Sequence, residues 1–321
     1  MSHCAVIPVI DDALPRPRWS VLIPTFNSGA YLEETLRSVL DQDPGAEHME
    51  IIVLDDHSTR DDPEALVNRI GRSRVRFIRQ SENVGKVRNY ETGLVTSRGL
   101  LVHQLHGDDR VHPGFYQAMD AAFDANPSAG AFFSESFYID QSGAVKGRTG
   151  RERSSTGLIN GFLDKIVVEQ RIQTPSIVVR RDVYEALGGF DSRLDMVEDW
   201  EMWIRVANAF PVGFVADTMA DYRVSPGGTT GNAILSGRLV QHVKDMLEVV
   251  DSYLPADVVA RCRSARNKGL AQYLTQFIPF LMERRQYRAV LRLYADALDF
   301  SAHPRAVYRL LYFTARYRQF L

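Results

Sequence analysis

The residues best suited to chemistry are two adjacent acids, Asp108 and Asp109, which end an apolar run that begins at Leu101. The run is typical of a buried strand, and Gly107 breaks it. In open α/β sheets, ligands bind at the carboxyl ends of the strands. Neighbouring carboxylates repel unless a cation lies beside them, and a hard divalent cation shares oxygen ligands with substrate phosphates. The pair predicts a metal and phosphate edge. Taken alone, it is better explained as a solvated loop after a strand, and the rest of the chain changes this balance.

Two further pairs of adjacent acids stand at the ends of expected elements. Asp55 and Asp56 end a second apolar run that starts at Met49. Glu198 and Asp199 stand at the expected start of a helix, where the helix dipole stabilises negative charge. Capping explains one acid at that position better than it explains two.

The elements that must position these acids alternate along the first two thirds of the chain. Apolar runs predict strands at 19–24, 49–54, 75–78, 101–105, 129–139, 174–179 and 211–216. Helical spacing predicts helices near 31–40, 61–71, 84–96, 113–126, 181–187 and 198–207. This alternation predicts an α/β fold with a mixed, mostly parallel sheet flanked by helices.

The composition suggests three segments. Residues 1–18 are polar and lack the basic start and apolar core of a signal peptide, so we expect a flexible leader. Residues 19–225 form the α/β domain, and the Gly, Pro and Thr run at 225–231 is the clearest linker. Residues 226–321 are expected to be all helical, with Pro255 among the helix starts.

A second proline, Pro304, is expected to start a later helix. The basic, polar stretch at 147–155 predicts a mobile loop, either a plain surface connection or a lid over an anionic ligand.

The net charge, the cysteines and the lengths of the apolar stretches disfavour several classes of protein. The 321 residues carry a formal net charge of -2, which argues against nucleic-acid binding by bulk charge. Cys4 and Cys262 form neither a zinc motif nor a disulfide framework, which fits a reducing compartment. No stretch reaches the ~18 consecutive apolar residues of a membrane span. We therefore expect a cytoplasmic protein.

Six motifs in order resemble those of family 2 glycosyltransferases, which are inverting nucleotide-sugar transferases with the GT-A fold. They are VLIPTFN (21–27), VLDDHST (53–59), NVGKVRN (83–89), HGDD (106–109), GGFD (188–191) and EDWE (198–201). Each motif alone is weak, but six in the family's order between Trp19 and Arg223 form a specific signal. The resemblance implies an enzyme that moves a sugar from a nucleoside-diphosphate sugar to an acceptor hydroxyl.

The resemblance also implies a donor site. Its residues would be Pro24, Thr25, Phe26 and Asn27 around the nucleobase and ribose, Asp55 or Asp56 accepting from a base N–H, Lys86, Arg88 and Asp108. Uracil and thymine offer such an N–H, which favours UDP- or dTDP-sugars. Arg88 would reach the base or the diphosphate. Asp108 and Asp109 would hold Mn²⁺ or Mg²⁺ to neutralise the diphosphate leaving group.

The third acidic pair would supply the base. Asp199 would take the proton of the acceptor hydroxyl, and Glu198 would support or share that role. Trp200 and Trp203 are candidates for a wall on which the acceptor sugar stacks, although core packing explains Trp203 at least as well.

This chain departs from the family in two places. His106 stands where the family usually has an aspartate, and imidazole suits Mn²⁺ better than Mg²⁺. His106 is therefore a third candidate metal ligand, or a residue behind the ligands or facing the acceptor. The family often carries a histidine shortly after its Tyr-Arg pair, whereas Tyr222 and Arg223 are followed by Val224.

The C-terminal segment mixes arginines such as Arg288 and Arg309 with aromatic residues such as Tyr312. Such a helix suits peripheral contact with the inner face of a membrane, and equally suits packing against the core or a homodimer partner. The acceptor would be a saccharide, a lipid-linked saccharide or a small molecule.

Other functions remain open. A nucleotidyltransferase needs a basic, glycine-rich loop after the first strand, and residues 25–30 carry no basic side chain. A dehydrogenase needs GxGxxG there, which is absent. A degenerate relative that binds a sugar nucleotide without catalysis is favoured by His106 and disfavoured by the intact pairs at 108–109 and 198–199.

Overall fold

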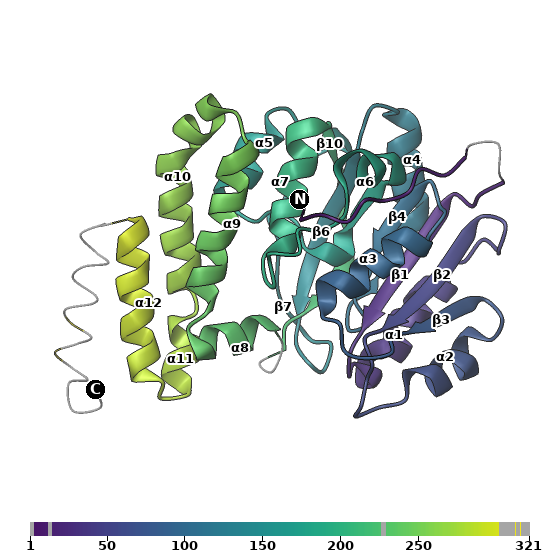
Figure 1. Cartoon of the computed structure of the whole chain (residues 1–321), viewed down its shortest axis with the longest axis horizontal. Coiled ribbons are helices and arrows are strands. Elements are labelled where there is room, and N and C mark those ends of the chain that lie inside the picture. The colour runs from purple at the N-terminus through teal and green to yellow at the C-terminus, as the bar shows by residue number, and fades with distance from the viewer. Residues whose placement is uncertain (1–2, 12–14, 226–228, 302–311, 313–314, 316–321) are drawn as a thin grey trace. The chain divides into compact units, whose positions relative to one another are not determined.

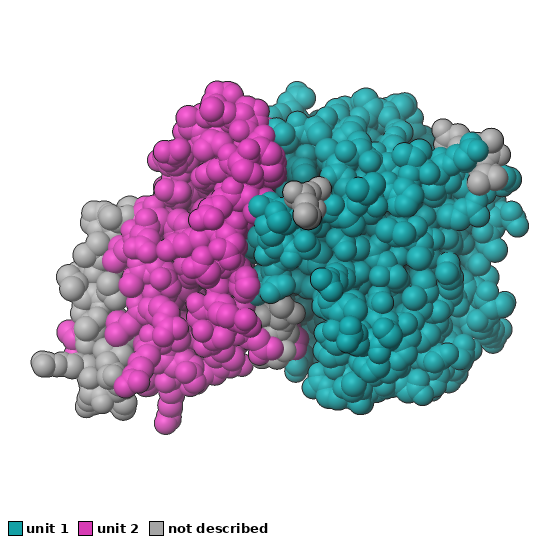
Figure 2. All heavy atoms as spheres, in the orientation of Figure 1, with its two compact units in different colours: residues 1–162, 171–224 teal, residues 163–170, 225–321 magenta. Residues whose placement is uncertain are grey.

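A computed structural model describes residues 3–11, 15–225, 229–301, 312 and 315 (Figure 1). The chain forms two compact units (Figure 2). Unit 1 comprises Met1–Phe162 and Arg171–Val224, and unit 2 comprises Leu163–Gln170 and Ser225–Leu321.

Ten strands in the described part of unit 1 form one sheet. They are β1 (Trp19–Thr25), β2 (Met49–Asp55), β3 (Val75–Arg79), β4 (Leu101–Gln104), β5 (Arg110–Val111), β6 (Ala131–Ile139), β7 (Val145–Arg148), β8 (Gly157–Leu158), β9 (Ile177–Arg180) and β10 (Val212–Arg223). The order is β3-β2-β1-β4-β9-β6-β10-β5, with β7 beside β6 and β8 beside β10. Because β9 runs antiparallel to both β4 and β6, the strands β1, β2, β3, β4, β6 and β10 share one direction. The predicted mixed, mostly parallel sheet is confirmed.

Helices cover both faces of the sheet. In unit 1 they are α1 (Gly29–Leu40), α2 (Pro63–Gly71), α3 (Lys86–Thr96), α4 (Phe115–Ala125), α6 (Arg181–Leu187) and α7 (Glu198–Ala209). Residues of α1, α2 and α4 form one core with Val21 and Ile23 of β1. Alternate residues of a strand point to opposite faces, and Leu22 accordingly packs with Leu54 under Gly93 of α3.

Three predicted strand boundaries need correction. Residues 174–176 form a short 3₁₀ turn, η1 (Thr174–Ser176), before β9 starts, because Pro175 lacks the N–H that a ladder needs. The strand predicted to end at Ala216 continues to Arg223 as β10. The loop predicted from Gly147 begins inside β7, which pairs antiparallel with β6.

The expected leader makes defined contacts within unit 1. The Gly189 amide donates to the Ala5 carbonyl at 2.8 Å, and Cys4 forms an isolated antiparallel bridge with Asp191. Ile7 is buried, and the buried Arg181 guanidinium donates to the Pro8 carbonyl at 3.1 Å.

Unit 2 is helical. Its elements are α5 (Phe162–Val168, whose first residue lies in unit 1), α8 (Thr229–Ser236), α9 (Leu239–Tyr253), α10 (Ala256–Thr275), α11 (Ile278–Glu283) and α12 (Tyr287–Phe300). The helix predicted after Pro255 is confirmed as α10. Gly269 lets α10 approach α5 closely, since a Cβ there would lie 2.9 Å from the Val168 carbonyl oxygen. The Arg261 guanidinium joins the same helices through an ion pair with Asp164 at 2.7 Å.

Some predictions concern residues outside the described part of the chain. The helix start at Pro304 and most of the basic aromatic segment after Ser301 lie there, as do residues 226–228 of the linker. Among the helices that are described, none is long and apolar enough to cross a membrane.

Candidate active site

The acidic edge forms where β4 ends. The parallel ladder with β1 is continued by hydrogen bonds from the Leu105 and Gly107 amides to β1 carbonyls. A Cβ on Gly107 would lie 2.9 Å from the Thr25 hydroxyl, so only glycine allows this close approach. The next two residues, Asp108 and Asp109, therefore emerge at the carboxyl edge of the sheet.

His106, Asp108 and Asp109 come together there, each offering one ligand atom, with all three atoms within 4.8 Å of one another. Asp109 is only 1% exposed. Its Oδ2 is buried without a hydrogen-bond partner, and the nearest cationic candidate, Nδ1 of His106, is 3.7 Å away. A buried carboxylate oxygen without a donor is costly. A divalent cation with oxygen ligands would satisfy it, so the donor set fits a metal.

The electrostatics agree with this fit. Burial, and then the neighbouring Asp108 carboxylate, hold the pKa of Asp109 well above its usual range. Burial also raises the pKa of Asp108. For His106, burial followed by the charge of Lys86 lowers the pKa to about 4, which leaves a neutral imidazole. A neutral imidazole can act as a metal ligand, whereas a protonated one cannot.

Arg223 at the end of β10 anchors this edge. Its backbone N–H donates to Oδ1 of Asp109 at 2.8 Å, and its Nε donates to the Asp108 carbonyl at 2.8 Å. The remaining guanidinium nitrogens donate to the Asp140 carbonyl at 3.0 Å and to Glu34 Oε2 at 2.8 Å. One buried side chain thus connects the acidic edge with the β6–β7 turn and α1.

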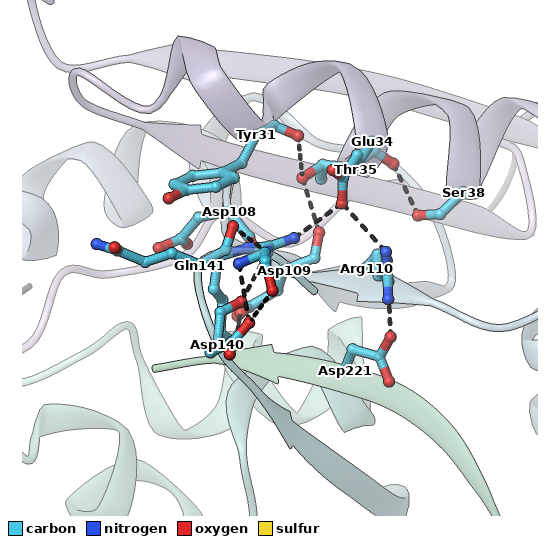
Figure 3. A network of polar contacts seen from close by, with 12 residues as sticks. Tyr31, Glu34, Thr35, Ser38, Asp108, Asp109, Arg110, Asp140, Gln141 and Asp221 are labelled. Atoms are coloured by element: carbon cyan, nitrogen blue, oxygen red, sulfur yellow. Dashed lines mark hydrogen bonds and ion pairs between the residues drawn. The ribbon is translucent and has the colours of Figure 1, made fainter. Parts of the chain in front are cut away.

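Helix α1 completes the support from the opposite side (Figure 3). The Thr35 hydroxyl donates to the Asp109 carbonyl at 2.7 Å. The Tyr31 ring lies 4.3 Å from the Arg223 guanidinium carbon, a cation–π contact. Hydrogen bonds from Arg223 and Thr35 therefore fix the backbone carbonyls of Asp108 and Asp109. Oδ2 of Asp109 stays available for a ligand.

The second acidic pair lies at the start of α7. Glu198 is 3% exposed, and its Oε2 lies 2.7 Å from Nζ of Lys86. Asp199 is partly exposed; its Oδ1 accepts from the Trp200 amide at 2.7 Å and its Oδ2 from the Thr174 hydroxyl at 3.3 Å. Burial raises the pKa of both acids, and the charge of Lys86 opposes that rise.

One turn of α3 joins the two acidic pairs. Lys86 reaches Glu198, and the Tyr90 hydroxyl lies 3.0 Å from Nε2 of His106. Residues four apart lie on one face of a helix. Burial, followed by the charges of Glu198, Asp199 and Asp108, raises the pKa of Tyr90. The acidic edge and the α7 acids thus belong to one candidate site.

The acids that end β2 brace neighbouring loops. The Ser58 amide and hydroxyl donate to Asp55, and Arg79 forms an ion pair with it at 3.3 Å. Asp56 accepts from the Val84 and Gly85 amides at 2.8 and 3.1 Å. Burial raises the pKa of Asp56 against the effect of these two bonds.

The turn after β1 is held by its asparagine. Asn27 has a positive φ of 53°, which asparagine tolerates better than most residues. Its Oδ1 accepts from the Thr59 and Arg60 amides at 3.0 and 2.9 Å. Phe26 between Thr25 and Asn27 is 46% exposed, an open aromatic surface at the sheet edge.

The remaining predicted site residues differ in exposure. Arg88 is exposed in the first turn of α3. Trp200 and Trp203 are 3% and 1% exposed, and the Trp203 ring packs edge-to-face on Phe190. This burial favours core packing for both tryptophans over a wall on which the acceptor sugar stacks.

Sequence reasoning gave no role to Tyr90, Thr174 or to the Arg223 side chain. The signal for Tyr90 was its position directly after the NVGKVRN motif and four residues after Lys86. Arg223 was visible as part of a Tyr-Arg pair, but its partners lie on three other segments and no local pattern points to them.

Comparisons with known proteins agree with this geometry. A family model described as Glycosyl transferase family 2 matches residues 20–188. An uncharacterized protein of Mycobacterium tuberculosis is 31% identical over 256 residues, which cover 76% of this chain and 79% of the relative.

Relatives of described activity match shorter parts. Poly(ribitol-phosphate) beta-N-acetylglucosaminyltransferase TarP of Staphylococcus aureus is 38% identical over 96 residues, 29% of each chain. Among solved structures, residues 1–349 of S. aureus TarS in complex with UDP-GlcNAc superpose with a TM-score of 0.64 at 16% identity. That match covers 88% of this chain and 81% of TarS 1–349.

Proposed function

This chain belongs to glycosyltransferase family 2 and has the GT-A fold, and on that basis we propose that it is an inverting, metal-assisted transferase. It moves a sugar from a nucleoside-diphosphate sugar, with UDP- or dTDP-sugars favoured, to an acceptor hydroxyl. The observation that carries the proposal is that α3 contacts both groups of candidate residues, Glu198 through Lys86 and His106 through Tyr90.

Asp108 and Asp109 hold the metal, Mn²⁺ or Mg²⁺, with His106 as the third candidate ligand. When bound, the metal supplies positive charge that neutralises the diphosphate leaving group. The residues behind the ligands hold the carboxylates in place. Arg223 and Thr35 fix the backbone of the edge, so little reorganisation is needed when the ion and the diphosphate arrive.

Asp199 is the general base. Inversion requires a base on the face opposite the leaving group, which takes the acceptor's proton as its oxygen attacks the anomeric carbon. Burial raises the pKa of Asp199, which makes it a stronger base than an exposed carboxylate. The Lys86 charge opposes that rise and favours the ionised form that the reaction needs. The ion pair with Glu198 keeps the Lys86 ammonium near Asp199.

The donor's base and ribose lie on Pro24, Thr25, Phe26 and Asn27. The exposed Phe26 offers a surface for the base, and Asp55 or Asp56 accepts from a base N–H. Both acids already accept hydrogen bonds, yet a carboxylate has roughly four acceptor sites. Lys86 and Arg88, at the start of α3, bind the diphosphate or the nucleobase of the donor. Solved structures of TarS with UDP and with UDP-GlcNAc support this choice of nucleotide.

The acceptor is a hydroxyl of a saccharide, a lipid-linked saccharide or a small molecule. Peripheral membrane contact through the C-terminal helices, a homodimer and a cytoplasmic location stay predictions.

The proposal is tested by thermal stability against UDP, dTDP, GDP and ADP, each with and without Mn²⁺ or Mg²⁺. We expect stabilisation by UDP or dTDP that requires the metal. Asp199→Asn is expected to keep this stabilisation and to lose release of UDP from UDP-sugars. Asp195→Asn, a nearby exposed aspartate, serves as the matched control. Unchanged turnover in Asp199→Asn would refute the assigned base, and no response to any nucleotide would refute the transferase itself.

A further inference from the structure

We propose that Thr174 is a positioning residue for the base Asp199, and that the buried His103 holds Thr174 in place from the metal-bearing strand. This inference rests on the proposed function, because it gives a role to two residues that act through Asp199. It concerns η1, a turn that carries no motif of the family resemblance.

Thr174 is 2% exposed, and its hydroxyl donates to Oδ2 of Asp199 at 3.3 Å. The Trp200 amide donates to the other oxygen, Oδ1, at 2.7 Å. Two donors on different oxygens fix the rotation of the carboxylate plane. A hydrogen bond to a carboxylate also favours its ionised form, so the Thr174 hydroxyl helps to keep the base ready to accept a proton.

His103 fixes the turn that carries Thr174. Its Nε2 lies 3.0 Å from the Pro175 carbonyl oxygen, and its Nδ1 lies 3.1 Å from the Tyr116 hydroxyl. A carbonyl oxygen only accepts, so Nε2 must carry the hydrogen and donate it. A neutral ring then accepts at Nδ1 from the Tyr116 hydroxyl. Burial lowers the pKa of His103 to about 4, which keeps the ring neutral and this arrangement intact.

This arrangement connects the two halves of the active site. His103 lies on β4, three residues before His106 of the metal edge. A line of contacts therefore runs from β4 through the His103 ring to the Pro175 carbonyl, and from Thr174 to the base. All these side chains except Asp199 are buried, so they can hold the base at a fixed place relative to the metal edge.

Other groups also face Asp199 and contribute to its titration. They include Lys86 from α3, Glu198 and the backbone N–H of Asp199 from α7 itself, and the phenol of Tyr90. Lys86 lowers the pKa of Asp199 by its charge, and Glu198 is the neighbouring acid. Replacing Thr174 leaves these groups in place, so a change in that variant reports on the hydroxyl alone.

The test replaces Thr174 by valine, which has the same shape without the hydroxyl. Two measurements follow: the titration of the Asp199 carboxyl carbon by ¹³C NMR, assigned by its loss in Asp199→Asn, and the pH profile of UDP release from UDP-GlcNAc. Thr174→Val is expected to raise the pKa of Asp199 and to move the acid limb of the profile to higher pH. It is expected to lower kcat about tenfold with KM for the donor unchanged.

Two matched variants separate positioning from general damage. Thr174→Ser retains the hydroxyl and is expected to restore the titration and most of the kcat. Thr96→Val removes a hydroxyl that bonds only the carbonyls of its own helix, and is expected to change neither. If Thr174→Val titrates like the wild type, or Thr174→Ser behaves like Thr174→Val, the role of Thr174 is refuted.

The contribution of His103 is tested from its far end. Tyr116→Phe removes the donor to Nδ1 and keeps the ring, and is expected to shift the Asp199 titration in the same direction by a smaller amount. No shift would refute the part played by His103. If Asp199→Asn is inactive while Thr174→Val matches the wild type, this inference alone fails. If Asp199→Asn keeps its turnover, the proposed base fails and the inference fails with it.

Discussion

The Lys86 ammonium lies 2.7 Å from Oε2 of Glu198, which joins the first residues of α3 and α7 across the active site. Glu198 is almost fully buried, whereas the Lys86 side chain keeps 30% of its surface exposed. Removing one partner of such a pair leaves the other charge buried without compensation. The ion pair therefore has a consequence for stability that can be measured without any substrate.

Lys86→Met is expected to lower the free energy of unfolding by about 2 kcal/mol, less than the ~3–5 kcal/mol of a fully buried pair because Lys86 is partly solvated. Urea unfolding measures the change. The double variant Lys86→Met with Glu198→Gln should recover most of the loss, since no charge is then stranded. Lys146→Met, which breaks an exposed pair with Asp140, should leave stability almost unchanged. Equal losses in both lysine variants would contradict this account.

Asp109→Asn is expected to change stability in opposite directions with and without metal. In metal-free protein the variant should melt at a higher temperature, because it removes a buried charge while its amide oxygen still accepts from the Arg223 amide. With UDP and Mn²⁺ at ~100 times their dissociation constants, the wild type gains about 2.7 kcal/mol that the variant should lack.

Differential scanning calorimetry with and without the metal makes this comparison, and the exposed Asp124→Asn serves as its control. An Asp109→Asn protein that still shows the metal-dependent gain would exclude Asp109 as a ligand.

His112 should make stability depend on pH. Its Nε2 lies 2.7 Å from Asp221 and its Nδ1 lies 3.1 Å from the Thr218 carbonyl oxygen, so both ring nitrogens face acceptors. The hydrogen bond with Asp221 raises the pKa of His112 above 6.5. The folded state therefore holds the proton more tightly, and this stabilisation is complete below pH ~6.5 and is lost as pH rises through the raised pKa.

The Asp221 side of the pair has the opposite limit. Burial opposes the change, but the bonds from His112 and Arg110 lower the pKa of Asp221, so its contribution is lost at strongly acidic pH. His112→Gln is thus expected to destabilise by about 1 kcal/mol at pH 5.5 and by clearly less at pH 8.5. Urea unfolding at both pH values measures the difference. A penalty that is equal at both would show that His112 is neutral in the folded protein.

The N-terminal segment is expected to contribute to stability. Ile7 is 2% exposed, and replacing it by alanine should cost about 2–4 kcal/mol. Val9, two residues later, is 77% exposed and Val9→Ala should cost almost nothing. Thermal unfolding of the two variants gives the comparison, and similar melting temperatures would mean that the segment detaches readily.

The strands could be predicted where burial leaves a continuous apolar run, as in β1 and β2. The prediction of strand boundaries failed where buried polar residues bond partners that are distant in sequence. The second half of β10 carries Asp221 and Arg223, which are buried because each bonds groups on other elements. Nothing local to Ala216–Arg223 reveals those partners, so the predicted strand ended too early.

The same limit applies to the active site. Acids at strand ends and at a helix start predicted the candidate residues that the structure brings together, because those positions have general chemical meaning. Their supports are pairs distant in sequence, such as Lys86 with Glu198 and Thr174 with Asp199. Such pairings depend on how strands and helices are placed in three dimensions, which side-chain periodicity does not encode.

The anchoring of Asp109 by the backbone of Arg223 has a consequence for modular exchange of the C-terminal helices. Unit 1 ends at Val224, one residue after Arg223, and the Val224 amide bonds the Ile139 carbonyl at 2.8 Å. A chimera joined after Val224 keeps every bond that holds the edge, whereas a junction a few residues earlier removes the support of Asp109. A new C-terminal unit joined downstream of that point leaves the support of Asp109 intact, but α5, whose Asp164 pairs with Arg261 of α10, must be exchanged with it.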